Sequence, residues 1–328
     1  SDLRKVIMSA KRTRAKSDDL SSEKKLKRSN SNVVDYMTQI QTNLRIKNVD
    51  IKEHTSTISE PVPDKKAKED TSEHAISTRS TFISDRLLSI EQELCIKLQD
   101  ITFPSSIQYI YNPLEYASET HAMYVHKYCT GIKKILFVGM NPGPWGMSQT
   151  GVPFGEINMV RDWLKISGPV GKPSKEHPDR KVIGFQCTRS EVSGLRLWSL
   201  FRELCGNPEN FFQNAYMHNY CPLAFMDGKA RNITPAGDGQ KILHEACDKS
   251  LIDIIQLLKV EIVIGIGNYA EKRAQTAVQT GGLSVQVMVL RHPSPRAVGN
   301  QNWNEIAKQR LNELELLKYF DNASITAV

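Results

Sequence analysis

The sequence lacks a long apolar run. Its longest candidate, VEIVIGIG at residues 260–267, is far shorter than the roughly 20 apolar residues that a membrane-spanning helix needs. The charges near the N-terminus are not followed by an apolar core, which argues against a secretory signal. We therefore expect an intracellular protein without a membrane partner.

Cysteine is scarce, and the spacing of the six cysteines excludes the common metal motifs. None forms a CxxC pair, so neither a zinc ribbon nor an iron–sulfur cluster is indicated. Reduced thiols in an apolar core are the simpler interpretation. The cysteines are Cys95, Cys129, Cys187, Cys205, Cys221 and Cys247.

Several catalytic signatures are also missing. The chain has no GxSxG elbow, no P-loop and no HExxH motif. Carboxylates do not cluster after the apolar runs that read as strands, which argues against a metal-dependent nuclease or an acid-rich nucleoside hydrolase. We expect no metal and no cofactor.

Residues 1–80 are poor in aromatics, with Tyr36 as the only one, and rich in charged and hydroxyl side chains. Such a segment cannot bury enough apolar surface to offset the entropy of ordering, so a disordered tail is predicted. Two basic clusters, KRTRAK at 11–16 and KKLKR at 24–28, are typical of a bipartite nuclear-localisation signal or a DNA-binding arm. A merely solvated tail is the alternative. The net charge of +7 and pI of about 9.0 suit a polyanionic partner without proving one.

The ordered domain is predicted to span residues 81–322. It opens with a helix for which Ser84 is the expected N-cap, and a second helix is expected to stop at Gly131. Four short apolar runs then predict buried strands, and helical patterns lie between them. This alternation predicts an α/β fold, a three-layer α/β/α sandwich around a mainly parallel four-stranded sheet. The runs are KKILFVGM at 133–140, NAYMHNYCPLAF at 214–225, VEIVIGIG at 260–267 and SVQVMVLRHP at 284–293.

The first strand leads into GMNPGPWGMSQTGVPFGE at 139–156, a loop rich in glycine and proline. Ligands of such sheets bind beyond the carboxyl ends of the strands, and glycines let the backbone approach a ligand closely. Asn141 at the strand end can orient a water, and Phe154 can stack on a planar base. The alternative is a structural turn in which Asn141 adopts a left-handed conformation.

The second strand contains the neighbours His218 and Asn219. Because side chains alternate along a strand, the two cannot both face one pocket. The amide of Asn219 offers a donor and an acceptor, which matches the O4 and N3–H edge of uracil, whereas cytosine reverses that pattern. A capping or network role for Asn219 is the alternative.

The fourth strand ends in RHPSPRAVGNQNW at 291–303. His292 lies just beyond the apolar run, and two prolines stiffen the loop that follows. Arg296 on this loop could contact phosphate or push into a base stack. The segment GIGNYA at 265–270 imitates a dinucleotide fingerprint, but no acid ends the next strand, so tight strand–helix packing explains its glycines better.

The three motifs GMNPGPWGMSQTGVPFGE, HNYCPL and HPSPR, in this order, resemble the single-strand-selective monofunctional branch of the uracil-DNA glycosylase superfamily. NMVRDWL, SEVSGLRLW, ARNITPA and AKQRLNELELL extend the likeness from about Asn112 to Leu317. It does not cover the N-terminal tail. The segments 226–240 and 297–303 are where we expect departures from the family.

The resemblance implies a role for each candidate residue. Asn141 would position the hydrolytic water, and His292 would stabilise negative charge on uracil O2. Phe154 would stack on the flipped base, and Asn219 would read its edge. Two further sets are implied: the backbone of Met140 and Gly143 as the pocket floor, and Pro293, Ser294, Pro295 and Arg296 as a DNA wedge.

The function implied is a nuclear, monomeric base-excision-repair glycosylase. It would hydrolyse the N-glycosidic bond of uracil, 5-hydroxymethyluracil and related oxidised pyrimidines in single- and double-stranded DNA. Two alternatives stay open, a catalytically silent module that binds damaged DNA and a hydrolase of free nucleosides. Lysines are abundant, and the sequence does not exclude a Schiff-base lyase.

Overall fold

The computed structural model describes residues 68–320, and residues 1–67, most of the predicted tail, lie outside the described residues, as do residues 321–328. All four predicted strands are present. They pair in the order β3-β2-β5-β6, and each neighbouring pair is parallel. The strands are β2 (Ile135–Gly139), β3 (Ala215–Asn219), β5 (Ile262–Ile266) and β6 (Gln286–Leu290).

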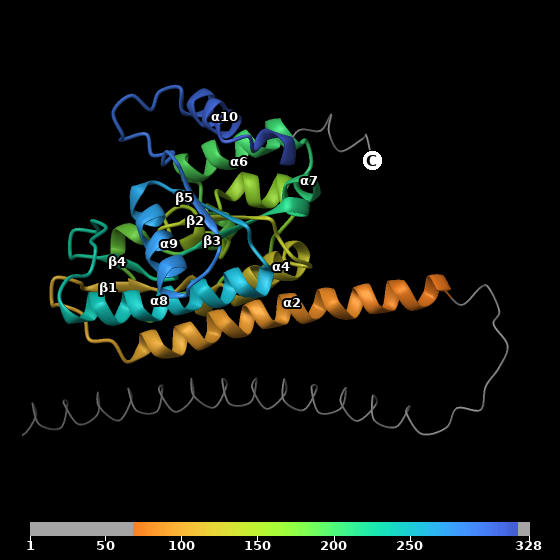
Figure 1. Ribbon diagram of the computed structural model, residues 1–328. Coiled ribbons are helices and arrows are strands. Elements are labelled where there is room, and N and C mark those ends of the chain that lie inside the picture. Colours follow the sequence, from red (N-terminus) through yellow and green to blue (C-terminus); the bar gives the residue numbers. More distant parts are fainter. Residues whose placement is uncertain (1–67, 321–328) are drawn as a thin grey trace, which may run out of the picture. The chain divides into compact units, whose positions relative to one another are not determined.

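Helices cover both faces of this sheet, which confirms the three-layer fold (Figure 1). On one face lie α8 (Asp238–Leu258) and α9 (Asn268–Thr280), with α2 (Lys68–Gln99) packed outside α8. On the other lie α6 (Val192–Cys205), α7 (Pro208–Asn214) and α10 (Trp303–Glu313). Every residue of β2 and β3 is buried, as expected for strands covered on both faces, and His218 and Asn219 of β3 are the polar exceptions in these otherwise apolar strands.

The remaining elements are short and connect these layers. A second, antiparallel sheet joins β1 (Tyr109–Tyr111) to β4 (Ala224–Met226). The predicted second strand is therefore two strands, separated by residues 220–223. The short helical segments are α3 (Pro113–Tyr116), α4 (Ser118–Tyr128), α5 (Met147–Thr150), η1 (Met159–Trp163), η2 (Pro178–Arg180), η3 (Gly184–Gln186) and η4 (Leu317–Tyr319).

Two predicted helix ends are wrong. Helix α2 begins at Lys68, so Ser84 does not cap it. The Ser84 hydroxyl instead donates to the Cys129 carbonyl at 2.8 Å, and a buried long-range bond of this kind leaves no signature in the local sequence. Helix α4 ends at Tyr128, three residues before Gly131, and Cys129 is its C-cap.

The cysteine prediction is confirmed, since all six are buried and unpaired. Among the described residues, no helix is long and apolar enough to cross a membrane.

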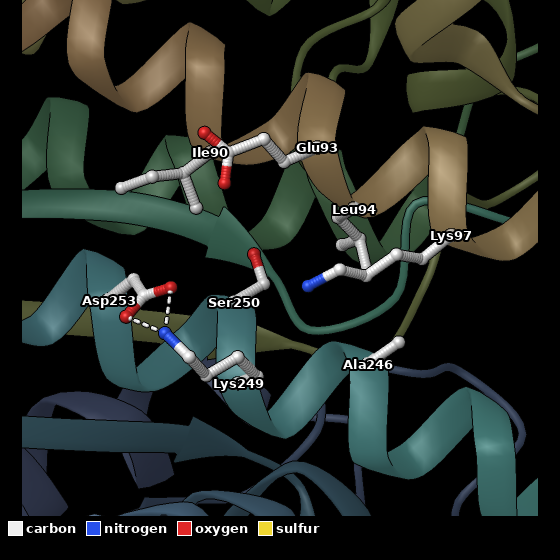
Figure 2. A pocket seen from close by; sticks show the side chains of 8 residues that line it. All are labelled: Ile90, Glu93, Leu94, Lys97, Ala246, Lys249, Ser250 and Asp253. Atoms are coloured by element: carbon white, nitrogen blue, oxygen red, sulfur yellow. Dashed lines mark hydrogen bonds and ion pairs between the residues drawn. The ribbon is translucent and has the colours of Figure 1, made fainter.

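A shallow pocket lies between α2 and α8, and Figure 2 shows its lining side chains. Its floor is the apolar contact of Ile90 and Leu94 with α8, and Lys249 pairs with Asp253 at its rim. None of the predicted site residues lines it. It is a surface groove between two helices.

Candidate active site

The four parallel strands end at one edge of the sheet. In the register, Gly139 of β2 lies opposite Asn219 of β3, and Ile266 of β5 lies opposite Leu290 of β6. Beyond this edge the pairing of the first two motifs continues, because the amide of Cys221 donates to the carbonyl of Met140 at 2.9 Å. The sheet itself therefore brings the predicted site residues together at one edge.

Asn141 is half-buried, and its side chain has a fixed orientation. Its Nδ2 donates to the carbonyl of Leu223 at 3.0 Å. The carbonyl oxygen of the same amide, Oδ1, accepts no hydrogen bond from the described residues. Asn141 is not among the residues with positive φ, so the left-handed structural turn is excluded. The free Oδ1 is an acceptor that can orient a water.

Asn219 is buried, with 6% of its surface exposed, and its amide is poorly satisfied. Its Nδ2 contacts only the thioether of Met147, at 3.2 Å, which is a weak acceptor. Its Oδ1 is buried without a partner among the described residues. Leaving a buried acceptor unpaired costs about 1–3 kcal/mol, so this amide is suited to a ligand that supplies the missing bonds.

Phe154 lies against Asn219 because Gly139 between them has no side chain. A Cβ built on Gly139 would lie 2.3 Å from Asn219 Oδ1 and 2.5 Å from Phe154 Cε2. The Phe154 ring also faces the His292 ring, with centroids 6.2 Å apart. One aromatic face, one unpaired amide and one imidazole therefore border the same small space.

The backbone at Phe154 is held in a strained conformation. Its φ is +52°, a region that bulky side chains rarely adopt. Gly194 at the start of α6 allows the close approach, since a Cβ there would lie 2.1 Å from the Phe154 carbonyl oxygen. That carbonyl accepts from the Glu156 amide at 2.8 Å, and the Trp198 indole N–H donates to the Pro153 carbonyl at 3.3 Å.

His292 has a tautomer that its hydrogen bonds define. The Ser294 amide donates to His292 Nδ1 at 3.1 Å, so Nδ1 is an acceptor and the proton lies on Nε2. Burial lowers the pKa of His292 below its ordinary value, which favours the neutral ring. His292 therefore offers a neutral Nε2–H donor, as expected for stabilising an anion without a formal charge.

The two glycines of the segment GIGNYA at 265–270 are required for different reasons. A Cβ on Gly265 would lie 2.3 Å from the Glu271 amide of α9, which confirms the predicted strand–helix packing. Gly267 has a φ of +88°, and a Cβ on it would lie 3.1 Å from His292 Cβ. Strand β5 separates β2 from β6, so a side chain at Gly267 would obstruct His292 on its way to the pocket.

The loop after His292 is clamped at its base and exposed at its tip. Asn300, which is 1% exposed, donates through Nδ2 to the carbonyls of His292 at 2.8 Å and Ser294 at 2.7 Å. Arg196 donates to the Pro293 carbonyl at 3.2 Å. Pro293 is buried and Ser294 half-buried, while Pro295 and Arg296 are exposed. Val298 is 93% exposed, an unusual position for an aliphatic side chain.

Met140 and Gly143 contribute to the first loop through their backbones. The Gly143 carbonyl accepts from the Ser148 amide at 3.1 Å. A Cβ on Gly143 would lie 2.2 Å from Glu191 Oε1, so the glycine admits this carboxylate. Burial raises the pKa of Glu191, although hydrogen bonds from the Trp145 and Gly146 amides oppose the shift.

A buried ionic cluster supports the loop from below. His121 Nδ1 lies 2.8 Å from the Gly151 carbonyl, and its Nε2 lies 2.7 Å from Glu91 Oε2. Since the carbonyl can only accept, Nδ1 carries a proton. Burial alone would lower the pKa of His121 and raise that of Glu91, but the pairing reverses both shifts. His218 Nδ1 lies 3.6 Å from Glu91 Oε1, so it faces away from Asn219's pocket, as strand alternation predicts.

Sequence reasoning missed most of the supporting residues. Glu91 on α2 and His121 on α4 support the first loop from outside the motifs, and no local pattern relates them to it. Met147 lies within the first motif and Asn300 within the segment 291–303, but nothing in the sequence singles out either side chain as a partner of Asn219 or His292. Gly139, Gly194 and Gly267 had a detectable signal, because each is a glycine inside one of the quoted segments.

A model of the uracil DNA glycosylase superfamily matches residues 126–316 of the chain. The match spans more than half of the sequence and contains all of the predicted site residues. The chain belongs to the uracil DNA glycosylase superfamily.

Curated relatives identify the branch of the superfamily to which the chain belongs. A mouse protein is 46% identical over 81% of this chain and 91% of its own length, and a bovine protein is 48% identical over 72% and 88%. Both are called single-strand selective monofunctional uracil DNA glycosylase, and they place the chain in that branch. The crystal structure of wild-type SMUG2 from Pedobacter heparinus, at 18% identity and a TM-score of 0.50, covers 71% of this chain and 98% of its own and shows the same fold.

Proposed function

We propose that the chain is a monofunctional glycosylase that removes uracil, 5-hydroxymethyluracil and related oxidised pyrimidines from single- and double-stranded DNA. The observation that supports this most directly is the packing of an unpaired buried amide and an aromatic ring against Gly139, with a neutral imidazole whose ring centroid lies 6.2 Å from that of the aromatic ring. These are the groups needed to hold a flipped pyrimidine and stabilise its departure.

Base reading is assigned to Asn219 and Phe154. The unpaired Oδ1 of Asn219 would accept from uracil N3–H, and its Nδ2, bound only to a thioether, would donate to O4. Cytosine has no N3–H donor and an amino group in place of O4, so it would leave both bonds unmade. The Phe154 ring would stack on the face of the base.

Bond cleavage is assigned to Asn141 and His292. The N-glycosidic bond breaks with its electron pair going to the base, which leaves an oxocarbenium-like sugar. His292 Nε2–H donates to the developing charge on O2, and the free Oδ1 of Asn141 orients the water whose oxygen bonds to C1′. The water's proton passes to solvent. No strong base is needed because the sugar cation is a potent electrophile.

The exposed loop of residues 293–300 is proposed to wedge into duplex DNA. Its base is fixed by Asn300 and Arg196, while Arg296 and Val298 protrude. Apolar side chains that part base steps are a common device of proteins that distort DNA. Flipping costs a few kcal/mol in a duplex and less in a single strand.

The test uses three uracil-containing substrates: a single-stranded oligonucleotide, a duplex, and free deoxyuridine, with a 5-hydroxymethyluracil oligonucleotide beside them. We expect free base from the DNA substrates and none from deoxyuridine. Strand scission should appear only after alkali, because simple hydrolysis leaves an abasic site. Base release from deoxyuridine alone would favour a nucleoside hydrolase, scission without alkali a lyase, and binding without release a silent damage-binding module.

We further propose that the protein is nuclear and monomeric. The two basic clusters at 11–16 and 24–28 support nuclear import. Replacing their lysines and arginines with glutamine should abolish nuclear accumulation of a tagged protein while leaving its glycosylase activity in extracts unchanged. Nuclear accumulation of the altered protein would contradict the assignment. Light scattering would test the monomer.

A further inference from the structure

Trp145 differs from the other three tryptophans of the chain. Trp163, Trp198 and Trp303 are buried, and each donates its indole N–H to a backbone carbonyl. Trp145 is half-buried, and its indole N–H makes no hydrogen bond with any residue that the structure describes. It lies in the first site loop, four residues after Asn141. Trp145 is therefore not packed in the way that a core tryptophan is.

Two arginines lie over the Trp145 ring. The guanidinium carbon of Arg189 is 4.2 Å from the ring centroid, and that of Arg180 is 5.4 Å. Both distances fall within the range of a cation–π interaction. A guanidinium stacked on an aromatic face keeps its N–H groups at its edge, where they can still bind a planar or tetrahedral oxyanion.

Neither guanidinium is neutralised by a carboxylate in residues 82–320. The arginines that form ion pairs there are Arg86, Arg161, Arg231, Arg273 and Arg310. Arg180 donates only to its neighbour's carbonyl, and its Nε is buried without a partner. Arg189 is exposed. The two cations therefore have unused donors.

The position of Trp145 is fixed by its backbone. Its amide donates to Glu191 Oε2 at 3.1 Å, and Glu191 lies against Gly143 of the same loop. Four residues of chain span at most about 14 Å. Trp145 therefore lies no farther from Asn141 than the length of a few nucleotides of a DNA strand. Arginines already ordered over a ring lose little freedom when they bind an anion.

We propose that Trp145, Arg180 and Arg189 form a binding site for a backbone phosphate of the DNA strand that contains the target nucleotide. This inference rests on the proposed function and extends it, because it assigns a strand contact outside the base pocket. The guanidinium edges and the free indole N–H are the donors. The site holds the strand close to the flipped nucleotide and does not take part in bond cleavage.

The test measures binding of a uracil-free single-stranded oligonucleotide over a range of salt concentrations. One phosphate contact contributes about 0.7 to the slope of log K against log salt on a single strand. Arg189→Gln should lower the slope by about that amount and weaken binding about tenfold at low salt. Trp145→Leu should lower it similarly, and Trp145→Phe less, because phenylalanine retains an aromatic face.

The matched control is Arg202→Gln, which removes an exposed arginine near the far end of α6. It should leave the slope unchanged. With a uracil oligonucleotide, Arg189→Gln should raise KM about tenfold without altering the single-turnover rate at saturation. An unaltered melting temperature would exclude a folding defect.

An unchanged slope and KM in both Arg189→Gln and Arg180→Gln would overturn the proposal. The proposed reaction fails separately: a protein that releases no base, yet whose salt slope falls in Arg189→Gln, retains the phosphate site without the glycosylase activity. A lower single-turnover rate with unchanged binding would also overturn it, since that result assigns Arg189 to the chemistry.

Discussion

Single residues at the strand ends decide the shape of the pocket, and Gly139 is the most sensitive of them. The space that a side chain would occupy is already filled by Asn219 and the Phe154 ring. Adding one methyl group must therefore displace the base-reading amide or the stacking ring.

Gly139→Ala is expected to lower the single-turnover rate on uracil DNA about 100-fold, because a displacement of about 1 Å at a reacting site costs that much. The measurement is base release from a single-stranded oligonucleotide. Gly131→Ala is the control, since a Cβ on Gly131 has no neighbour within 4 Å. Equal rates for both variants would contradict the packing argument.

The sequence predicted the residues of the pocket better than their surroundings. Asn141, Asn219 and His292 could be proposed because each lies at the end of an apolar run, and Phe154 because it is the aromatic residue at the far end of the glycine-rich loop. The hydrogen bonds that orient them could not. Leu223 acts on Asn141 through a backbone carbonyl, and any residue at that position has one.

At the scale of elements, the loop of residues 293–300 combines a rigid base with an apolar tip. Val298→Ala should lower activity on a uracil duplex up to about tenfold and leave single-stranded activity unchanged, because only a duplex requires a wedge. Ile132→Ala, which shortens an exposed aliphatic residue outside the site, should alter neither. An equal loss on both substrates would assign Val298 to something other than strand separation.

Helix α2 supports the first loop through Glu91 and His121. Removing one partner of a buried ion pair costs about 3 to 5 kcal/mol. Glu91→Gln should therefore lower the free energy of unfolding by about 3 kcal/mol near pH 6, measured by urea denaturation. Glu93→Gln on the same helix removes an exposed partner of Arg86 and should cost less than about 1 kcal/mol.

The pH dependence of this effect has a definite sign. His121 has a raised pKa in the fold, so its contribution is complete below pH 6.5 and is lost as pH rises through the folded pKa. Glu91 has a lowered pKa, so its contribution is present above about pH 4.5 and is lost at lower pH. The difference in the free energy of unfolding between the native chain and Glu91→Gln should thus become smaller at alkaline pH. A constant difference from pH 6 to pH 10 would contradict the pairing.

Element prediction succeeded for the four strands and failed at helix ends. Apolar runs bounded by glycine or proline are strong signals for buried strands. The start of α2 is different, because Ser84 resembles an N-cap locally but bonds to Cys129 across the fold. The antiparallel pair of β1 and β4 was also missed, since three-residue strands have too little pattern to detect.

For the whole molecule, the parallel sheet explains why residues from positions 141 to 292 can act together. Strand order places β5 between β2 and β6, and Gly267 at the end of β5 leaves room for His292. The central claim is that Asn141 in the first motif and His292 in the third act on the same N-glycosidic bond.

That claim is tested by the single-turnover rate of uracil release from single-stranded DNA in Asn141→Ala and His292→Ala. We expect the rate of His292→Ala to fall about 100- to 1000-fold, as it does when one preorganised donor is removed. The rate of Asn141→Ala should fall by a comparable factor. Binding of uracil-free DNA should be unchanged in both. Retention of the native rate by either variant would contradict the assignment of the pocket.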